Sequence, residues 1–113
     1  MKKPLLLFDV DGTIAESGCE LNINIKNVLH ILKDTYDLGI VGGGTFEKIL
    51  LQLGTNTLFK HIFSECGCVY NKIHNGSYKT VYKKNIRHHE QYTNINKLIK
   101  ICLSYLSRVN YEI

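Results

Sequence analysis

The sequence contains little of what builds several large classes of protein. One proline and nine glycines among 113 residues exclude a collagen-like or low-complexity chain. No apolar run approaches the roughly 18 residues that a membrane-spanning helix needs. The apolar stretch from Leu5 to Phe8 is interrupted by Asp9 and is too short for the core of a secretion signal. We therefore expect a cytoplasmic protein that binds no membrane.

Neither the cysteines nor the charge indicate a specialised class. Without a secretion signal, the four cysteines are expected to be free thiols, because disulfides are rare in the cytosol. The net charge of +4 is mild, and the basic residues are scattered rather than gathered in a stripe with aromatic side chains. We therefore expect no nucleic-acid partner. The length predicts a single domain over residues 1–113, and the hydrophobic content of 44% is that of an ordinary globular protein.

Hydrophobic patterning predicts alternating strands and helices in the first half of the chain. Residues 5–8 form a continuous apolar run, which is typical of a parallel strand that is buried on both faces. A helix capped by Asn22 or Asn24 follows, then a strand over residues 38–41 and a helix capped by Thr45. This order predicts an α/β fold with a parallel sheet. The helix residues expected to face the core are Ile25, Val28, Leu29, Leu32, Phe46, Ile49, Leu50 and Leu53.

The second half of the chain has a different pattern. Asn75-Gly76 is a strong signal for a two-residue turn and predicts an antiparallel hairpin at one side of the sheet. Apolar residues between Ile95 and Leu106 recur at offsets of three and four. That spacing predicts an amphipathic helix, which Asn94 would cap.

Two acidic residues directly follow the first predicted strand. Asp9 and Asp11 stand at positions i and i+2, so their carboxylates would face the same side of an extended segment. Carboxylates that close repel each other unless a cation joins them, and Mg²⁺ prefers such oxygen ligands. Asp9 could then attack a phosphorus atom while Asp11 transfers a proton, and Thr13 could bind phosphate oxygens. The alternative is a surface turn, because Asp-Gly is common in turns.

The segment Phe8-Asp9-Val10-Asp11-Gly12-Thr13 resembles the first motif of the phosphotransferases of the haloacid dehalogenase superfamily. More specifically, the chain is similar to the N-terminal part of eukaryotic phosphomannomutase. This resemblance implies a partial haloacid dehalogenase-like (Rossmann-like) core, with a parallel sheet, an antiparallel hairpin and no cap domain. The stretches that carry the resemblance are residues 7–14, 39–43, 46–48, 52–54 and 101–106.

The resemblance also implies roles for individual residues. Asp9 would be the nucleophile that becomes phosphorylated, and Asp11 the general acid and base. Both would belong to the Mg²⁺ site, Asp9 through its carboxylate and Asp11 through its main-chain carbonyl. The substrate would be a sugar phosphate, and the reaction would interconvert mannose 6-phosphate and mannose 1-phosphate for the supply of GDP-mannose. The residues that would bind the substrate phosphate are Thr13, Gly43, Gly44 and Thr45.

Some positions depart from the family pattern. The loop over residues 15–19 lacks the arginine that contacts the sugar phosphate in the family, and Gly44 stands where the second motif has serine. Thr45 could supply that hydroxyl one position later, or could act only as a helix cap. The match ends before the cap domain and before the later motifs with their lysine and acidic metal ligands. We therefore expect weak Mg²⁺ binding and no mutase activity from this chain alone, and slow phosphatase activity stays open.

Three functions stay open at this point. The chain could be a phosphomannomutase-like enzyme, a small phosphatase of the same superfamily, or a non-catalytic fragment. The resemblance further implies that the strand over residues 5–10 lies at a sheet edge, because its neighbour on one side would come from the later core. An exposed apolar edge favours pairing with another chain. We therefore expect self-association or binding of a complementary C-terminal fragment.

Overall fold

The computed structural model describes residues 2–54 and 58–110, which belong to two compact units. The first unit runs from Met1 to Lys83 and the second from Lys84 to Ile113. The expectation that residues 1–113 behave as a single domain stays a prediction. Across the described ranges, no helix combines the length and the apolar character that crossing a membrane requires. All four cysteines are free, as expected.

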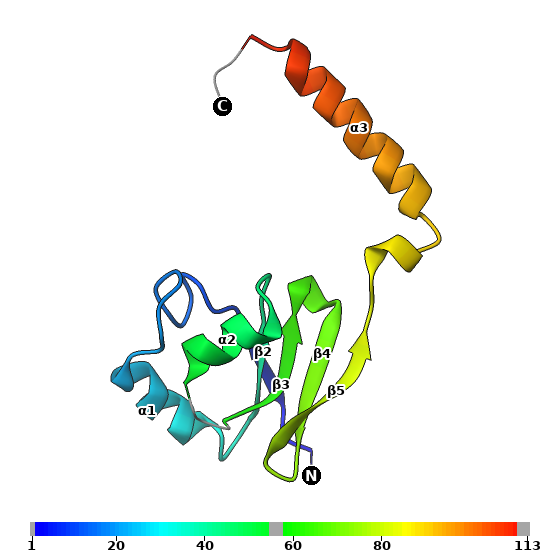
Figure 1. The fold of residues 1–113 in the computed structure, drawn as a ribbon. Helices are drawn as coiled ribbons and strands as arrows, with labels where there is room; N and C mark the ends of the chain where they lie inside the picture. Colours follow the sequence, from blue (N-terminus) through cyan, green and yellow to red (C-terminus); the bar gives the residue numbers. More distant parts are fainter. Residues whose placement is uncertain (1, 55–57, 111–113) are drawn as a thin grey trace. The chain divides into compact units, whose positions relative to one another are not determined.

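The first unit is built on a five-stranded sheet whose strands follow one another in chain order (Figure 1). Strands β1 (Leu5–Phe8), β2 (Asp37–Val41) and β3 (Phe59–Ser64) are parallel. Strands β4 (Val69–His74) and β5 (Ser77–Lys83) continue the sheet in antiparallel pairing. The prediction of a mixed α/β fold with a hairpin at one side is confirmed. Among the described strands, β1 forms the opposite edge, as also predicted.

The turn between β4 and β5 has the conformation that its sequence predicts. Asn75 and Gly76 have φ angles of 51° and 79°. Two successive positive φ angles define a type I′ turn, whose twist matches that of the flanking strands. Asparagine and glycine are the residues that adopt this backbone conformation most readily, so the turn sets the register of the hairpin.

Two helices follow the first two strands, and a side-chain cap starts each of them. Helix α1 (Ile23–Leu32) is capped by Asn22, whose Oδ1 accepts a hydrogen bond of 3.0 Å from the Ile25 N–H. Helix α2 (Phe46–Leu53) is capped by Thr45, whose Oγ1 accepts one of 3.2 Å from the Lys48 N–H. Of the two candidate caps for the first helix, Asn22 is therefore the one used.

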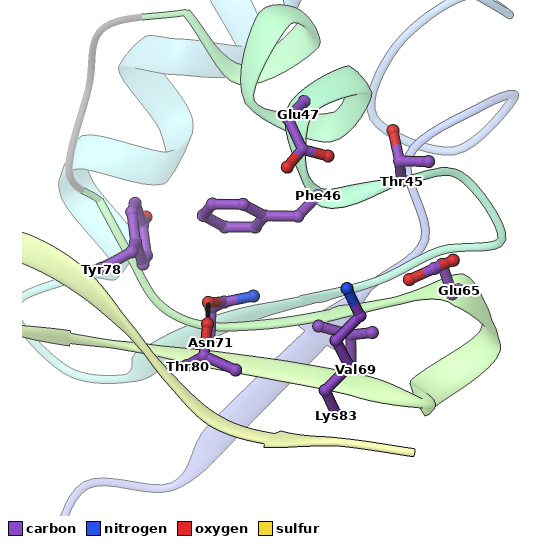
Figure 2. A pocket seen from close by; sticks show the side chains of 9 residues that line it. All are labelled: Thr45, Phe46, Glu47, Glu65, Val69, Asn71, Tyr78, Thr80 and Lys83. Atoms are coloured by element: carbon purple, nitrogen blue, oxygen red, sulfur yellow. Dashed lines mark hydrogen bonds between the residues drawn. The ribbon is translucent and has the colours of Figure 1, made fainter. Parts of the chain in front are cut away.

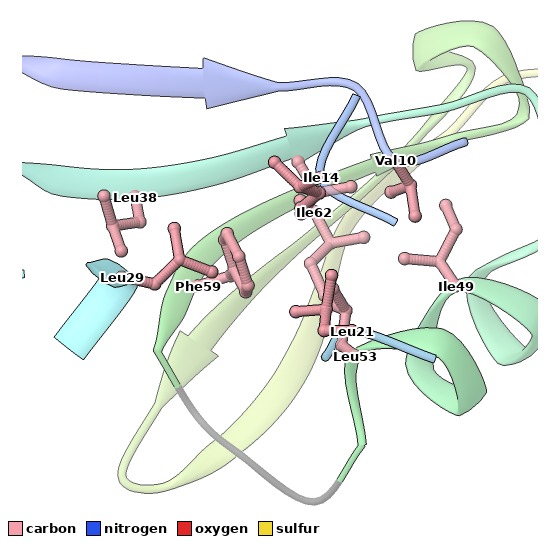
Figure 3. Close-up of a cluster of buried hydrophobic side chains, with 10 residues drawn as sticks. Val10, Ile14, Leu21, Leu29, Leu38, Ile49, Leu53, Phe59 and Ile62 are labelled. Carbon is pink, nitrogen blue, oxygen red and sulfur yellow. The ribbon is translucent and has the colours of Figure 1, made fainter. Parts of the chain in front are cut away.

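The core lies between these two helices and one face of the sheet (Figure 3). Leu29 is the buried residue of α1, and Ile49 and Leu53 are the buried apolar residues of α2. Val28 is 52% exposed, so the prediction that it faces the core is wrong. The apolar face of α1 that packs on the sheet is narrow and centred on Leu29, and Val28 lies beside it. The sheet residues that these helices cover are Leu38, Ile40, Phe59 and Ile62.

Strand β1 is half-buried on one face and exposed on the other, so the prediction of burial on both faces is wrong. Leu6 and Phe8 pack against the core, whereas Leu5 and Leu7 are 45% and 50% exposed. Side chains alternate along a strand, and within the described part of the first unit α1 and α2 both pack on the same face of the sheet. Leu5 and Leu7 therefore form an apolar surface at the edge of the sheet.

The second unit contains a short 3-10 helix, η2 (Ile86–His88), and the long helix α3 (Tyr92–Arg108). Gln91, not the expected Asn94, stands at the N-cap of α3. Asn94 lies in the first turn, where its side-chain nitrogen donates a hydrogen bond of 2.8 Å to Oε1 of Gln91. No residue of α3 is buried, although its apolar residues have the predicted helical spacing.

Candidate active site

A tight turn follows β1 and sets the positions of the acidic residues. The Val10 carbonyl accepts hydrogen bonds from the N–H groups of Thr13, Ile14 and Ala15, at 3.2, 3.1 and 3.1 Å. Gly12 has a φ angle of 74°, a left-handed conformation that glycine adopts without a steric penalty. Val10 and Ile14 are only 3% and 8% exposed, so their side chains anchor the turn in the core.

Asp9 is the first residue after β1, and its side chain is exposed. The Thr13 hydroxyl donates a long hydrogen bond of 3.4 Å to Oδ2 of Asp9. No other hydrogen bond to the Asp9 carboxylate occurs among the described residues. The structure thus brings together two of the predicted site residues, and it leaves the Asp9 carboxylate accessible to a ligand.

The carboxylate of Asp11 has a different set of partners. Its Oδ1 accepts a hydrogen bond of 2.7 Å from Nε2 of Gln52 and one of 3.0 Å from the Gly18 N–H. The bond from Gln52 lowers the pKa of Asp11 most, followed by the bond from Gly18; desolvation opposes them, and the positive charge of Lys48 adds a smaller lowering. Asp11 is therefore held in its ionised form, in which it can accept a proton.

Gln52 is the site residue that the sequence analysis did not identify. It lies on α2, is 6% exposed, and also donates from Nε2 to the Cys19 carbonyl at 3.2 Å. The main-chain carbonyl of Gln52 accepts a hydrogen bond of 3.0 Å from the Leu21 N–H. These bonds tie the loop after the acidic motif to α2. The signal in the sequence was an amide three residues after Ile49, on the apolar face of the helix.

The glycine segment after β2 is held by the loop that follows β3. The Cys66 N–H donates to the Gly42 carbonyl and the Glu65 N–H to the Gly44 carbonyl, both at 3.0 Å. Thr45 follows and acts as the helix cap described above, so this one of its two predicted roles is observed. No described hydrogen bond joins residues 43–45 to Asp9 or Asp11. They share with Asp9 a position after the carboxyl end of a parallel strand.

The oxygen atoms after β1 suit a hard divalent cation. The Asp9 carboxylate is exposed, and none of the described hydrogen bonds uses the main-chain carbonyl of Asp11. Carboxylate and carbonyl oxygens are the donors that Mg²⁺ prefers. Among the described residues, no three His, Cys, Asp or Glu side chains come together as a metal site. Water would therefore have to complete the coordination.

Comparison with known proteins identifies the family. The family model for eukaryotic phosphomannomutase matches residues 25–113. The chain belongs to the eukaryotic phosphomannomutase family. The resemblance carried by the motifs is thereby confirmed, and the chain is a member of a family of enzymes.

Individual phosphomannomutases are similar over nearly all of this chain. The enzyme of Galdieria sulphuraria is 35% identical over 106 residues, which cover 91% of this chain and 40% of that protein. Phosphomannomutase 2 of Dictyostelium discoideum is 32% identical over 114 residues, which cover 99% of this chain and 44% of that protein. The second alignment covers the acidic motif at Asp9. The chain spans about two fifths of the length of these relatives.

Solved structures support the fold assignment. An IMP-bound, N-terminally truncated IMP-nucleotidase from Plasmodium falciparum has a TM-score of 0.56 at 15% identity, over 95% of this chain and 34% of that one. A hypothetical protein from Geobacillus kaustophilus has a TM-score of 0.54 at 18% identity, over 91% of this chain and 37% of that one. The chain thus shares a mixed α/β fold with these two structures.

Proposed function

We propose that Asp9 is the nucleophile of a phosphomannomutase reaction and that Asp11 is its proton donor and acceptor. The observation that carries this proposal is the exposed Asp9 carboxylate at the carboxyl end of β1, beside the Thr13 hydroxyl, in a chain of this family. The substrates would be mannose 6-phosphate and mannose 1-phosphate, in the cytoplasmic supply of GDP-mannose.

The proposed reaction consists of two phosphoryl transfers. In the first, a hydroxyl of the mannose monophosphate attacks the phosphorus of phosphorylated Asp9 and passes its proton to Asp11, which releases the Asp9 carboxylate and a hexose bisphosphate. The hexose bisphosphate then reorients in the site, so that its other phosphoryl group faces Asp9. In the second, Asp9 attacks the other phosphoryl group, and Asp11 returns the proton to the departing sugar oxygen.

The hydrogen bonds of Asp11 support the first of these transfers. The bonds from Gln52 and Gly18 lower the pKa of Asp11, which favours the ionised form that can accept a proton, although it also makes that form a weaker base. Mg²⁺ held by the Asp9 carboxylate and the Asp11 carbonyl would offset the charge of the phosphoryl oxygens. The residues proposed to bind phosphate oxygens are Thr13, Gly43, Gly44 and Thr45.

A second candidate function is hydrolysis of the aspartyl phosphate. The observation that favours it is the exposure of Asp9, because water that reaches an acyl phosphate can take the place of the sugar hydroxyl. For this chain alone we expect no mutase activity, and slow phosphatase activity with mannose 1-phosphate is the alternative that the assay below tests.

The nucleophile can be tested by trapping the aspartyl phosphate. The chain is incubated with Mg²⁺ and acetyl phosphate, and the peptide that contains Asp9 is analysed by mass spectrometry. We expect a phosphoryl adduct that is absent from Asp9→Asn and present in Asp34→Asn, a control at an exposed aspartate outside the site. An adduct that persists in Asp9→Asn, or none in a folded wild-type chain, would contradict the proposal and support the non-catalytic alternative.

The products then separate the two catalytic functions. Mannose 6-phosphate formed from mannose 1-phosphate indicates a mutase, whereas inorganic phosphate alone indicates a phosphatase.

Calorimetric titration with Mg²⁺ tests the metal site, and we expect weak binding that Asp9→Asn abolishes. A site of micromolar or tighter affinity would reveal a third protein ligand.

A further inference from the structure

A cavity that neither Asp9 nor Asp11 lines lies within the first unit. It has a volume of about 430 Å³ and opens between the first turn of α2 and strands β4 and β5 (Figure 2). Thr45 is the one predicted site residue that lines it, and neither Asp9 nor Asp11 does. The volume falls within the range of roughly 300–1,000 Å³ that is typical of small-molecule sites.

The side chain of Asn71 is the polar group at the bottom of this cavity. Asn71 is 4% exposed, and its Oδ1 accepts a hydrogen bond of 2.8 Å from the Thr80 hydroxyl. None of the described residues accepts a hydrogen bond from its side-chain nitrogen, which Figure 2 shows directed into the space between Phe46 and Val69. Buried amide groups are nearly always hydrogen-bonded. The Asn71 nitrogen is not among the buried atoms that lack a partner, so it is open to the cavity, where water or a ligand can accept its hydrogen bonds.

The wall of the cavity opposite Asn71 is apolar and held in place. The rings of Phe46 and Tyr78 pack edge to face, with centroids 5.6 Å apart. The Tyr78 hydroxyl donates a hydrogen bond of 2.6 Å to the Phe59 carbonyl, which ties this pair to β3. Val69 adds a buried aliphatic surface. A ligand must therefore present an apolar surface to Phe46 and Val69 as well as an acceptor to Asn71.

The charges around the cavity restrict the ligand further. Glu47 and Glu65 contribute two carboxylates and Lys83 one ammonium group, so the lining carries a net negative charge. Glu47 lies in the first turn of α2 and already complements the positive end of the helix dipole. An anionic group such as a phosphate is disfavoured beside Glu47 and Glu65, so a phosphate bound by Thr45 would have to lie on the side of Gly43 and Gly44 rather than in this cavity. Hydroxyl groups fit better, because each can donate to a carboxylate and accept from Asn71 or Lys83.

We propose that this cavity binds a neutral pyranose sugar. The ring carbons of the sugar would pack on Phe46 and Val69, and its hydroxyls would bind Asn71, Lys83 and the two carboxylates. The proposal does not depend on phosphoryl transfer at Asp9. It predicts a preference for unphosphorylated over phosphorylated sugars at this site.

The test is a titration of the ¹⁵N-labelled 113-residue chain, followed by NMR. Methyl α-D-mannopyranoside, the corresponding glucoside and mannose 1-phosphate are added separately, and the side-chain N–H signals of Asn71 are monitored. We expect saturable shifts with at least one neutral glycoside, at a Kd of about 1 mM, and weaker binding of mannose 1-phosphate. No saturable shift from either glycoside, or stronger binding of the phosphate, would overturn the proposal.

Three variants locate the site. Asn71→Leu and Phe46→Leu should each weaken binding roughly three- to tenfold, as expected for the loss of one hydrogen bond or one ring contact. Lys79→Gln changes a lysine of the same strand as Lys83 that does not line the cavity, and it should leave the affinity unchanged. Phe46→Leu keeps the test decisive if Asn71→Leu does not fold. Unchanged affinity in a folded Asn71→Leu or Phe46→Leu variant would contradict the assignment.

A further variant separates this proposal from the proposed function. Asp9→Asn should abolish the phosphoryl adduct and leave glycoside binding unchanged, because Asp9 does not line the cavity. Loss of glycoside binding in a folded Asp9→Asn variant would place the sugar at the acidic motif and overturn the second site.

Discussion

Gln52 donates a hydrogen bond of 2.7 Å to the carboxylate of Asp11, although the two residues are 41 positions apart in the sequence. Gln52 is buried on α2, whereas Asp11 lies in the exposed turn after β1. A buried side chain has few alternative rotamers, so Gln52 holds the carboxylate in one orientation. Helix α2 therefore positions the group that we propose to transfer protons.

Replacing Gln52 by leucine should raise the pKa of Asp11, because the largest cause of its lowering is removed. A lowered pKa stabilises the folded state at pH values above the ordinary pKa of an aspartate, and this contribution is lost as the pH falls through the folded value. Titration of the side-chain carboxyl ¹³C signals checks the shift. Gln91→Leu, at an exposed glutamine of the second unit, is the control. An unchanged pKa of Asp11 in folded Gln52→Leu would contradict the positioning role.

Two leucines of α2 allow a matched test of the core. Leu53 is 1% exposed and Leu51 is 78% exposed. Leu53→Ala should lower the free energy of unfolding by about 2–5 kcal/mol, because it leaves a cavity among packed side chains. Leu51→Ala should change it by no more than about 0.5 kcal/mol. Urea denaturation followed by circular dichroism measures both values, and equal effects would show that this face of α2 is not packed as described.

Tyr78 should lose its proton at a higher pH than an ordinary tyrosine, and the free energy of unfolding should therefore change with pH in the alkaline range. Burial raises its pKa from 10.0 to about 12. Its neutral form is favoured in the folded state, so the stabilisation is complete below about pH 10, the unfolded pKa, and is lost as the pH rises towards 12. In a pH titration followed by tyrosinate absorbance, one component should appear near pH 12. This component should be missing in Tyr78→Phe and retained in Tyr105→Phe, which changes an exposed tyrosine. A component near pH 12 that survives Tyr78→Phe would contradict this assignment, whereas a smaller delay from Tyr70, whose pKa burial also raises, should remain.

The Tyr78→Phe variant also removes the hydrogen bond to the Phe59 carbonyl. We expect a loss of about 1 kcal/mol in the free energy of unfolding at neutral pH. Urea denaturation of the same variant provides the value.

The edge strand β1 should make the chain associate with itself. Its outer face exposes Leu5 and Leu7, and its outer edge has no neighbouring strand among the described residues. Such edges pair with other chains unless charge, proline or a covering element prevents it. Sedimentation should therefore show concentration-dependent association that Leu7→Lys reduces. Leu51→Lys, at an exposed leucine outside the sheet, should not reduce it.

A complementary C-terminal fragment is the other expected occupant of this edge. It would replace self-association by a one-to-one complex in the same sedimentation experiment. A chain that stays monomeric and unfolds cooperatively above about 60 °C would contradict the expectation of an unsatisfied edge.

The sequence alone determined the local features of this protein. The Asn75-Gly76 turn, the Thr45 cap and the acidic motif after the first strand all depend on residues within a few positions of one another. Such short-range preferences act before the chain is packed, so they can be identified without the fold. The choice of Asn22 over Asn24, and of Gln91 over Asn94, shows the remaining uncertainty of one turn at a helix start.

Only the tertiary structure decided which distant residues meet. The exposure of Leu5 and Leu7 depends on α1 and α2 packing on the same face of the sheet, which no local pattern of β1 records. The bond from Gln52 to Asp11 and the bond from Thr80 to Asn71 likewise arise where separate segments are brought together. Packing decides these contacts because each joins side chains that the fold brings together from separate segments, and for the buried Gln52 it also removes water as the alternative hydrogen-bond partner.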